Sequence, residues 1–164
     1  MGGGVLWNAP ASSPRTGLLY VPSVDWCTTY TLGGDRAHWM GRYWGGSVRW
    51  DPVDQSRGAL TTIDASSGAV RWRYASDAPM PAAVTATATA SGLLMTGEVS
   101  GDFLVLNALN GKVLYRFHTG GAVAGGIISY AVDGRQYLAA MSGSMTSLWH
   151  RVFNLSQSGG VFGG

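Results

Sequence analysis

The side chains that most often bind metals or act as nucleophiles are few in this 164-residue sequence, and they lie far apart. The histidines are His38, His118 and His150, with no His-x-His or His-x-x-x-His spacing, and Cys27 is the only cysteine. Because zinc sites use closely spaced Cys and His ligands, no zinc site is expected. The sequence also lacks the Gly-x-Ser-x-Gly motif of serine hydrolases, and its glycine-rich segment 120–126 lacks the Lys-Ser/Thr pair of a phosphate-binding loop. We therefore expect no catalytic residue and no metal ligand in this chain.

The most regular pattern is a spacing that occurs twice. In each copy an Asp or Asn is followed four residues later by Gly and eight residues later by a large aromatic: Asp64, Gly68 and Trp72, then Asn107, Gly111 and Tyr115. The second copy lies 43 residues after the first, and an apolar run leads into each one, at 60–63 and 103–106. A strand, a polar turn and a second strand in a unit of roughly 40 to 50 residues are typical of β-propeller blades.

The physical chemistry of a turn between antiparallel strands explains this spacing. Asp64 and Asn107 can hydrogen-bond the backbone of their own turns, and a Gly tolerates the positive φ that such turns require. The aromatic then falls on the outgoing strand, where Trp72 can slide between adjacent blades while its indole N–H reaches a carbonyl. Two unrelated hairpins that share a turn type by chance are the alternative interpretation.

Composition agrees with an all-β protein. Charged residues make up only 12% of the chain and glycines number 25, which favours a turn-rich β fold over a helical bundle or a disordered chain. With 11 Lys and Arg against 9 Asp and Glu, the net charge of +2 is too balanced to indicate nucleic acid as a partner. The sequence predicts a partial β-propeller of about three to four four-stranded antiparallel blades.

The remaining polar residues fit structural roles. Asp64 is interpreted as a turn cap, and Asp133, which precedes a Gly, as a hairpin turn residue. Glu98 and Asp102 are expected to be polar groups at blade edges. His118, at the end of a strand, is expected to be a surface or interblade group.

A specific family resemblance follows from these residues. Segment 60–72 resembles the tryptophan-docking motif of quinoprotein dehydrogenases, the eight-bladed propellers that carry pyrroloquinoline quinone (PQQ), with Thr62 in place of the motif's Ala. Further segments resemble the C-terminal part of PQQ-dependent alcohol dehydrogenases and follow in family order: 2–7, 16–22, 85–97, 101–106 and 134–140. On this resemblance, residues 1–155 are C-terminal blades with a long loop excursion at 31–57, and residues 156–164 are a flexible Gly-rich tail.

The resemblance also identifies candidate cofactor residues, with two departures. In the family a Gly-Gly-x-Asn-Trp segment brings an Asn and a Trp to the quinone; here Trp7 is kept and Leu6 stands where the Asn should be. An Asn amide can hydrogen-bond a quinone oxygen and Leu cannot, so Leu6 weakens the expected site. Trp7 is either a cofactor contact or an ordinary core aromatic. The second departure is Pro81, Ala82 and Ala83, where many relatives carry a Trp beside paired glycines under the cofactor.

The resemblance implies a parent enzyme that uses PQQ and Ca²⁺ to oxidise an alcohol or a sugar and passes electrons to cytochrome c or ubiquinone. The Ca²⁺ ligands and the Asp base are expected in sequence that precedes this stretch, so the chain alone is expected to be inactive and to need the remaining blades of the propeller. A non-catalytic, PQQ-like propeller segment that acts as a protein-binding scaffold is the alternative.

The expected compartment is the periplasm, again by resemblance. Residues 1–5 lack the basic and apolar regions of a signal peptide, which we interpret as an internal start or a gene fragment. In that compartment Cys27 can pair with a cysteine of the missing portion, and the alternative is a small buried thiol.

Overall fold

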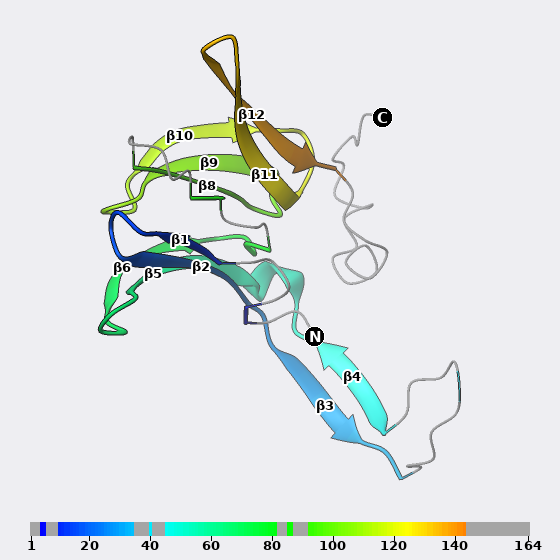
Figure 1. Cartoon of the computed structure of the whole chain (residues 1–164). Coiled ribbons are helices and arrows are strands. Elements are labelled where there is room, and N and C mark those ends of the chain that lie inside the picture. The colour runs from blue at the N-terminus through cyan, green and yellow to red at the C-terminus, as the bar shows by residue number, and fades with distance from the viewer. Residues whose placement is uncertain are drawn as a thin grey trace.

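The computed structural model describes residues 4–5, 10–34, 40, 45–81, 85–86 and 92–143. Within them the chain is all-β, and its helical content is a single 3₁₀ turn, η1 (Val53–Gln55). The regular elements form antiparallel sheets whose strands follow one another up and down, as in stacked propeller blades (Figure 1). No helix of the described part is long and apolar enough to cross a membrane. The expected all-β partial propeller is confirmed.

The first blade is a four-stranded sheet in the order β1-β2-β5-β6. Its strands are β1 (Ala11–Ser13), β2 (Leu18–Asp25), β5 (Arg57–Asp64) and β6 (Val70–Ser76). Side chains alternate along β2 between buried and half-buried positions, because one face of the strand meets the second blade. β5 is the most enclosed strand of this sheet, consistent with its place between β2 and β6.

The second blade repeats this plan in the order β10-β9-β8-β7. Its strands are β7 (Thr85–Ala86), β8 (Leu93–Gly97), β9 (Asp102–Asn107) and β10 (Val113–His118). The two outer hairpins correspond residue by residue at a distance of 43: Thr62 pairs with Trp72 next to an irregularity in the register, and Val105 pairs with Tyr115 next to the same irregularity. The period found in the sequence is therefore also the period of the strand pairing.

A third sheet has only two strands in the described residues, β11 (Val123–Val132) and β12 (Arg135–Ser142). Buried Val123 and Ile127 pack on the second blade, where the first strands of a third blade belong. The described residues thus complete two four-stranded blades, fewer than the three to four expected. The difference arises because segments 82–84, 87–91 and 144–164 lie outside the described residues and because part of the intervening sequence forms a separate hairpin.

This hairpin lies within the expected excursion and begins slightly before it. Strands β3 (Thr28–Leu32) and β4 (Gly46–Trp50) form a two-stranded ribbon that projects away from the blades (Figure 1). Because β2 and β5 pair directly with each other, the ribbon is an insertion between two neighbouring strands of one blade. The sequence showed no clean periodicity here, since only part of the segment is regular. The tail expected at 156–164 lies outside the described residues.

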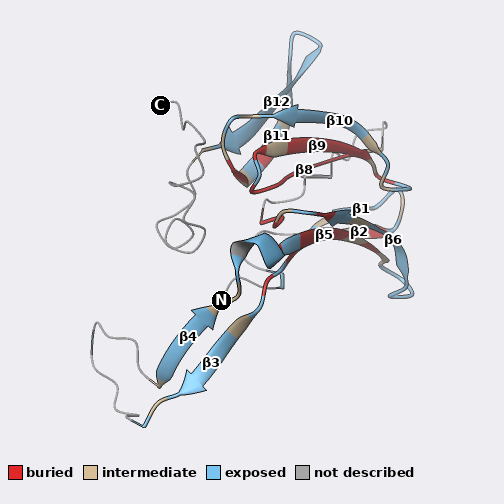
Figure 2. Ribbon diagram, turned by 180° about the vertical axis from the view of Figure 1, so that it is seen from behind, coloured by how far each residue is buried: buried red, intermediate tan, exposed pale blue. Residues whose placement is uncertain are grey.

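The main core lies between the two blades. Figure 2 shows buried residues concentrated on β2, β5, β8 and β9, the strands that face one another, whereas the ribbon and β12 are exposed. The core is made of apolar side chains from both sheets: Leu18, Tyr20, Leu60, Met80, Leu94, Leu104, Leu106 and Ala108. Removal of this apolar surface from water holds the blades face to face.

Candidate functional site

The two Asx-x-x-x-Gly turns have the same geometry. In the first, Asp64 Oδ1 accepts hydrogen bonds from the backbone N–H of Ser66 at 3.0 Å and Ser67 at 3.1 Å. In the second, Asn107 Oδ1 accepts the N–H of Leu109 at 2.9 Å. Gly68 and Gly111 close the turns with φ of 74° and 70°, and each donates its N–H to the carbonyl of the Asp or Asn at 2.8 Å. Both turns therefore need a short polar residue at the start and Gly at the end.

Trp72 of the first blade lies on the turn of the second. Its indole N–H donates to the carbonyl of Ala108 at 3.2 Å, and its ring lies over Gly111. A Cβ added at Gly111 would come within 2.6 Å of the Trp72 ring, so the close approach requires Gly as well as the positive φ does. Tyr20 flanks the indole with a centroid distance of 6.2 Å. The first blade is thus joined to the second by an aromatic ring, a hydrogen bond and a glycine.

Tyr115 occupies the matching position on the second blade but has no turn beneath it in the described structure. The side chain is 55% exposed, and its neighbour on the same face, Phe117, is 54% exposed. The six residues of the repeat therefore fall into two groups in space. Trp72 meets Gly111 and the turn that Asn107 starts, whereas Asp64, Gly68 and Tyr115 lie on the outer sides of the pair of blades.

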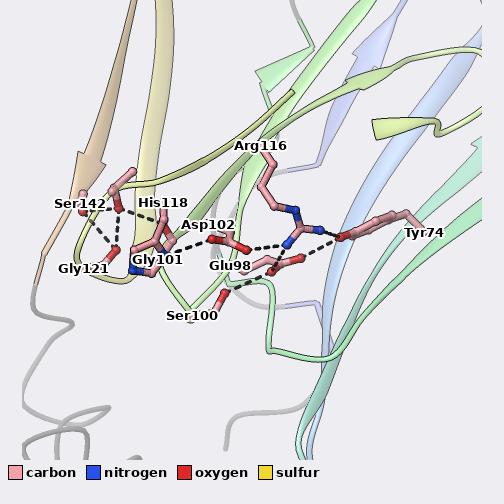
Figure 3. Close-up of polar contacts among 10 residues, drawn as sticks. Tyr74, Glu98, Ser100, Gly101, Asp102, Arg116, His118, Gly121 and Ser142 are labelled. Carbon is pink, nitrogen blue, oxygen red and sulfur yellow. Dashed lines mark hydrogen bonds and ion pairs between the residues drawn. The ribbon is translucent and has the colours of Figure 1, made fainter. Parts of the chain in front are cut away.

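A polar network extends this junction (Figure 3). The Tyr74 hydroxyl of the first blade donates to Glu98 Oε1 of the second at 3.0 Å and accepts from Arg116 Nη2 at 3.0 Å. The same guanidinium pairs with Asp102, whose other oxygen lies 3.1 Å from His118 Nδ1. The network therefore runs from β6 through the end of β8 to β9 and β10.

The network also reaches the third sheet. The Thr119 hydroxyl donates to the carbonyls of Gly101 at 3.0 Å and Gly121 at 2.8 Å, and lies 2.7 Å from the Ser142 hydroxyl at the end of β12. Ser142 in turn donates to Gly121 at 3.1 Å. These contacts place one polar seam across all three sheets at the same end of the strands.

Glu98 departs from the blade-edge position expected of it. The residue is only 4% exposed, and its carboxylate lies at the junction, where Tyr74 and Ser100 donate to it. Arg116 supplies the nearest positive charge, at 3.9 Å. No local signal in the sequence could reveal this, because Tyr74 lies 24 residues earlier in the chain and on another blade.

The electrostatics follow from burial and from these partners. Burial raises the pKa of the Tyr74 hydroxyl, and the Glu98 carboxylate raises it further. Partial burial opposes ionisation of Asp102, but hydrogen bonds from His118 and Arg116 outweigh it and hold the pKa below its ordinary value. Hydrogen bonds from Ser66 and then from Arg71 hold the pKa of exposed Asp64 well below its ordinary value.

The arrangement can position blades and shows no means of catalysis. The described residues contain no group of three or more His, Cys, Asp and Glu side chains placed to hold a metal ion. Each carboxylate in the network is already paired or hydrogen-bonded within the protein. Cys27 is an exposed free thiol here, which differs from the expectation of a buried one and leaves the disulfide with a missing portion as a proposal.

The cofactor candidates Leu6, Trp7, Ala82 and Ala83 lie outside the described residues, but the backbone on one side of each pair does not. Gly4 forms an isolated antiparallel bridge with Val24 at the end of β2, with hydrogen bonds of 2.6 and 3.0 Å. The carbonyl of Pro79 accepts from the N–H of Val99 at 3.0 Å.

The two bridges meet in one buried cluster. Val24 and Val99 both belong to it, together with Trp26 and Ala122, and Trp50 of the ribbon packs on Trp26 at a centroid distance of 4.5 Å. Two segments that are about 75 residues apart in the chain are therefore anchored at the same end of the two blades. This strand end is the candidate cofactor-facing side of the chain.

Comparison with known proteins yields relatives of one kind. No protein-family model matches the chain. The quinoprotein ethanol dehydrogenase of Pseudomonas aeruginosa is 35% identical over 142 residues, which cover 86% of this chain and 22% of that protein. The 1-butanol dehydrogenase (quinone) of Thauera butanivorans is 32% identical over the same shares of the two chains.

Solved structures agree with this relationship. A europium-containing methanol dehydrogenase superposes with a TM-score of 0.70 at 31% identity, over 82% of this chain and 24% of that one. The quinohemoprotein alcohol dehydrogenase ADHIIG of Pseudomonas putida HK5 superposes with a TM-score of 0.71 at 20% identity, which shows the shared fold. The chain spans about a fifth of the length of the curated relatives it matches. Over most of its length, this chain is homologous to a stretch of the quinoprotein alcohol dehydrogenases.

Proposed function

We propose that the chain forms part of a PQQ-dependent dehydrogenase that oxidises alcohols, with sugars as the second substrate class to test. The proposal is supported by the 142-residue similarity to dehydrogenases named for ethanol and 1-butanol. It is carried by one observation in this structure: the bridges at Gly4 and Pro79 anchor both candidate cofactor segments at one end of the blades. Segments so far apart in the chain converge only when a shared surface is built from them.

The chain's own part in this activity is structural support for the cofactor and not the chemical step. The described residues do not fit a metal site, so we propose that the metal ligands and the general base come from other blades. The metal expected from the sequence is Ca²⁺. A relative from Methylorubrum extorquens is a lanthanide-dependent methanol dehydrogenase, 29% identical over 143 residues, so a lanthanide is the second metal to test.

Electron transfer to a cytochrome is the proposed fate of the reducing equivalents, with ubiquinone as the alternative acceptor. One relative is named lupanine 17-hydroxylase [cytochrome c], and it is 32% identical over 142 residues. We propose a periplasmic location on the same resemblance. None of the described residues carries a haem-attachment motif, so the acceptor is proposed as a separate domain or protein.

A chimera tests the proposal. The homologous stretch of the Pseudomonas aeruginosa ethanol dehydrogenase is replaced by this chain, and the purified chimera is supplied with PQQ and either Ca²⁺ or La³⁺. Dye-linked oxidation of ethanol, 1-butanol and glucose is measured, with the chain alone as the control. We expect alcohol oxidation by the chimera and none by residues 1–164 alone.

The fold of the chimera is checked by its thermal melt before activity is interpreted. A chimera that melts cooperatively and binds no PQQ would contradict the proposal and favour the scaffold alternative. Turnover by residues 1–164 alone would contradict the placement of the metal ligands and base on other blades.

A further inference from the structure

We infer that the outer face of the second blade is a docking site for one β-hairpin whose turn has the sequence Asx-x-x-x-Gly. The hairpin would pair with the free edge of β12 and place its turn under Tyr115. The inference rests on the proposed function for the source of the hairpin, the remaining sequence of a propeller. Its geometry comes from the internal repeat.

The strand pairing identifies the face. Leu104 lies in the core between the blades, and its partner Arg116 reaches Tyr74 of the first blade. Phe103 and Val105 lie on the opposite face, in a buried cluster with Val123 and Ile127 of β11. Because directly paired residues share a face, Phe117 and Tyr115 lie on this opposite face as well.

The same face is covered along its inner strands and uncovered along its outer strand. β11 buries Val105 to 8% exposure, whereas Tyr115, paired with it, remains 55% exposed. The pattern leaves two aromatic rings on β10 without a partner in the described structure. An exposed apolar face of this kind beside an existing blade contact is an interaction surface.

The first blade shows what covers this position when the next blade is complete. Thr62 and Trp72 are the counterparts of Val105 and Tyr115, and the outer hairpin of the second blade places its turn against Trp72. By this equivalence Tyr115 awaits a turn of the same kind, whose first carbonyl after the Asx would accept the tyrosine hydroxyl. Gly is required at the end of that turn, since a Cβ at Gly111 would crowd the Trp72 ring at 2.6 Å.

The edge of the third sheet points to the same occupant. In the two complete blades the second strand pairs on both sides, β2 with β1 and β5, and β8 with β7 and β9. β12, the second strand of the third sheet, pairs only with β11 in the described residues. Two further strands would complete this blade, and an unpaired edge is the template on which they add.

The chain itself has no turn left to supply. Besides the two turns already described, the sequence contains one Asx-x-x-x-Gly, at 54–58, and its Gly58 is buried in β5. A second copy cannot dock as a whole blade, because β11 already holds the inner half of the face. The occupant is therefore a hairpin and not a complete blade.

The experiment uses the first blade's own outer hairpin as a probe. A peptide of residues 57–76 is added to the purified chain, and binding is followed by polarisation of a fluorophore on the peptide and by hydrogen exchange of the β12 amides. A second design appends the same residues after Gly164 through a flexible linker, which raises the effective concentration if the free peptide folds poorly. We expect binding and slower exchange along β12.

Matched variants separate docking from unspecific adhesion. Tyr115→Ser should weaken binding by about tenfold, whereas Tyr30→Ser, an equally exposed tyrosine on the ribbon, should not change it. Gly68→Val in the probe should weaken binding by a similar factor, because the turn can no longer approach the ring.

Three results would overturn the inference: no protection of β12 by the peptide or by the appended copy, equal binding by Tyr115→Ser, or equal binding of the Gly68→Val probe. None of these results depends on PQQ or on turnover. A chimera without alcohol oxidation would contradict the proposed function and leave hairpin docking intact.

Discussion

The indole N–H of Trp72 donates to the backbone carbonyl of Ala108, 36 residues further along the chain and on the next blade, at 3.2 Å. The bond satisfies a polar group that the ring carries into a largely apolar junction, and it fixes the ring over the second turn. One residue of the repeat thereby sets the distance and the rotation between two blades.

Truncation of Trp72 should separate the two blades' stabilities. Trp72→Ala removes the ring between the sheets and should lower the free energy of unfolding by about 3 kcal/mol. Tyr115→Ala removes the aromatic at the matching position, where the side chain is exposed, and should change it by less than about 1 kcal/mol. Urea unfolding of both variants measures the difference, and equal losses would show that Trp72 does not hold the junction.

The two turn glycines form a matched pair of a different kind. Gly68 and Gly111 have nearly the same positive φ, but a Cβ at Gly68 meets nothing within 4 Å. Gly68→Ala should therefore lose only about 1 kcal/mol of stability through backbone strain. Gly111→Ala should lose about 2 kcal/mol more, because its Cβ also displaces the Trp72 ring. A thermal melt in which both variants lose the same amount would rule out close docking on Gly111.

Two buried hydroxyls should be replaceable with a gain in stability. The Oγ1 atoms of Thr62 and Thr96 have no hydrogen-bond partner in the described structure, and both residues are fully buried. In the other blade Val105 and Val21 occupy the equivalent positions of the strand pairing. Thr62→Val and Thr96→Val keep the side-chain shape and should each raise the free energy of unfolding by about 1 kcal/mol. Destabilisation by either variant would mean that the hydroxyl has a partner, such as a bound water.

The Asp102 carboxylate should make stability depend on pH in acid. Its pKa is lowered in the folded chain, so the stability it contributes is present above the ordinary carboxyl range near about 4 and is lost as the pH falls through the lowered pKa. Since Arg116 and His118 are largely exposed, the effect should be under about 1 kcal/mol. Asp102→Asn should flatten the dependence of the unfolding midpoint on pH below about 5. Asp77→Asn, at an exposed acid, serves as the control; an unchanged slope in Asp102→Asn would contradict the argument.

Leu6→Asn tests the departure from the family's quinone segment. In the chimera with the ethanol dehydrogenase, the new amide can donate to a quinone oxygen, so we expect PQQ to bind about tenfold more tightly. The measurement is titration of PQQ by its absorbance, with Leu6→Ala as the control for side-chain size. Equal affinity of the Asn and Ala variants would show that this position does not face the quinone.

The sequence by itself was sufficient for the repeated units. The Asx-x-x-x-Gly spacing states both the turn chemistry and the strands beside it, because backbone hydrogen bonding and positive φ act within a few residues. It was also sufficient for the family relationship, which the comparisons confirm over most of the chain. The strand period of two identified β9 and β10 close to their observed bounds.

Only the tertiary structure decided which repeats have partners. Trp72 and Tyr115 have the same local sequence setting, yet the first is covered and the second exposed, because burial depends on what lies on the facing sheet. The same holds for Glu98, which the local sequence assigns to a blade edge and which Tyr74 and Arg116 convert into a buried junction group. Side chains distant in the chain set these environments, and no spacing within one strand records which sheet will face it.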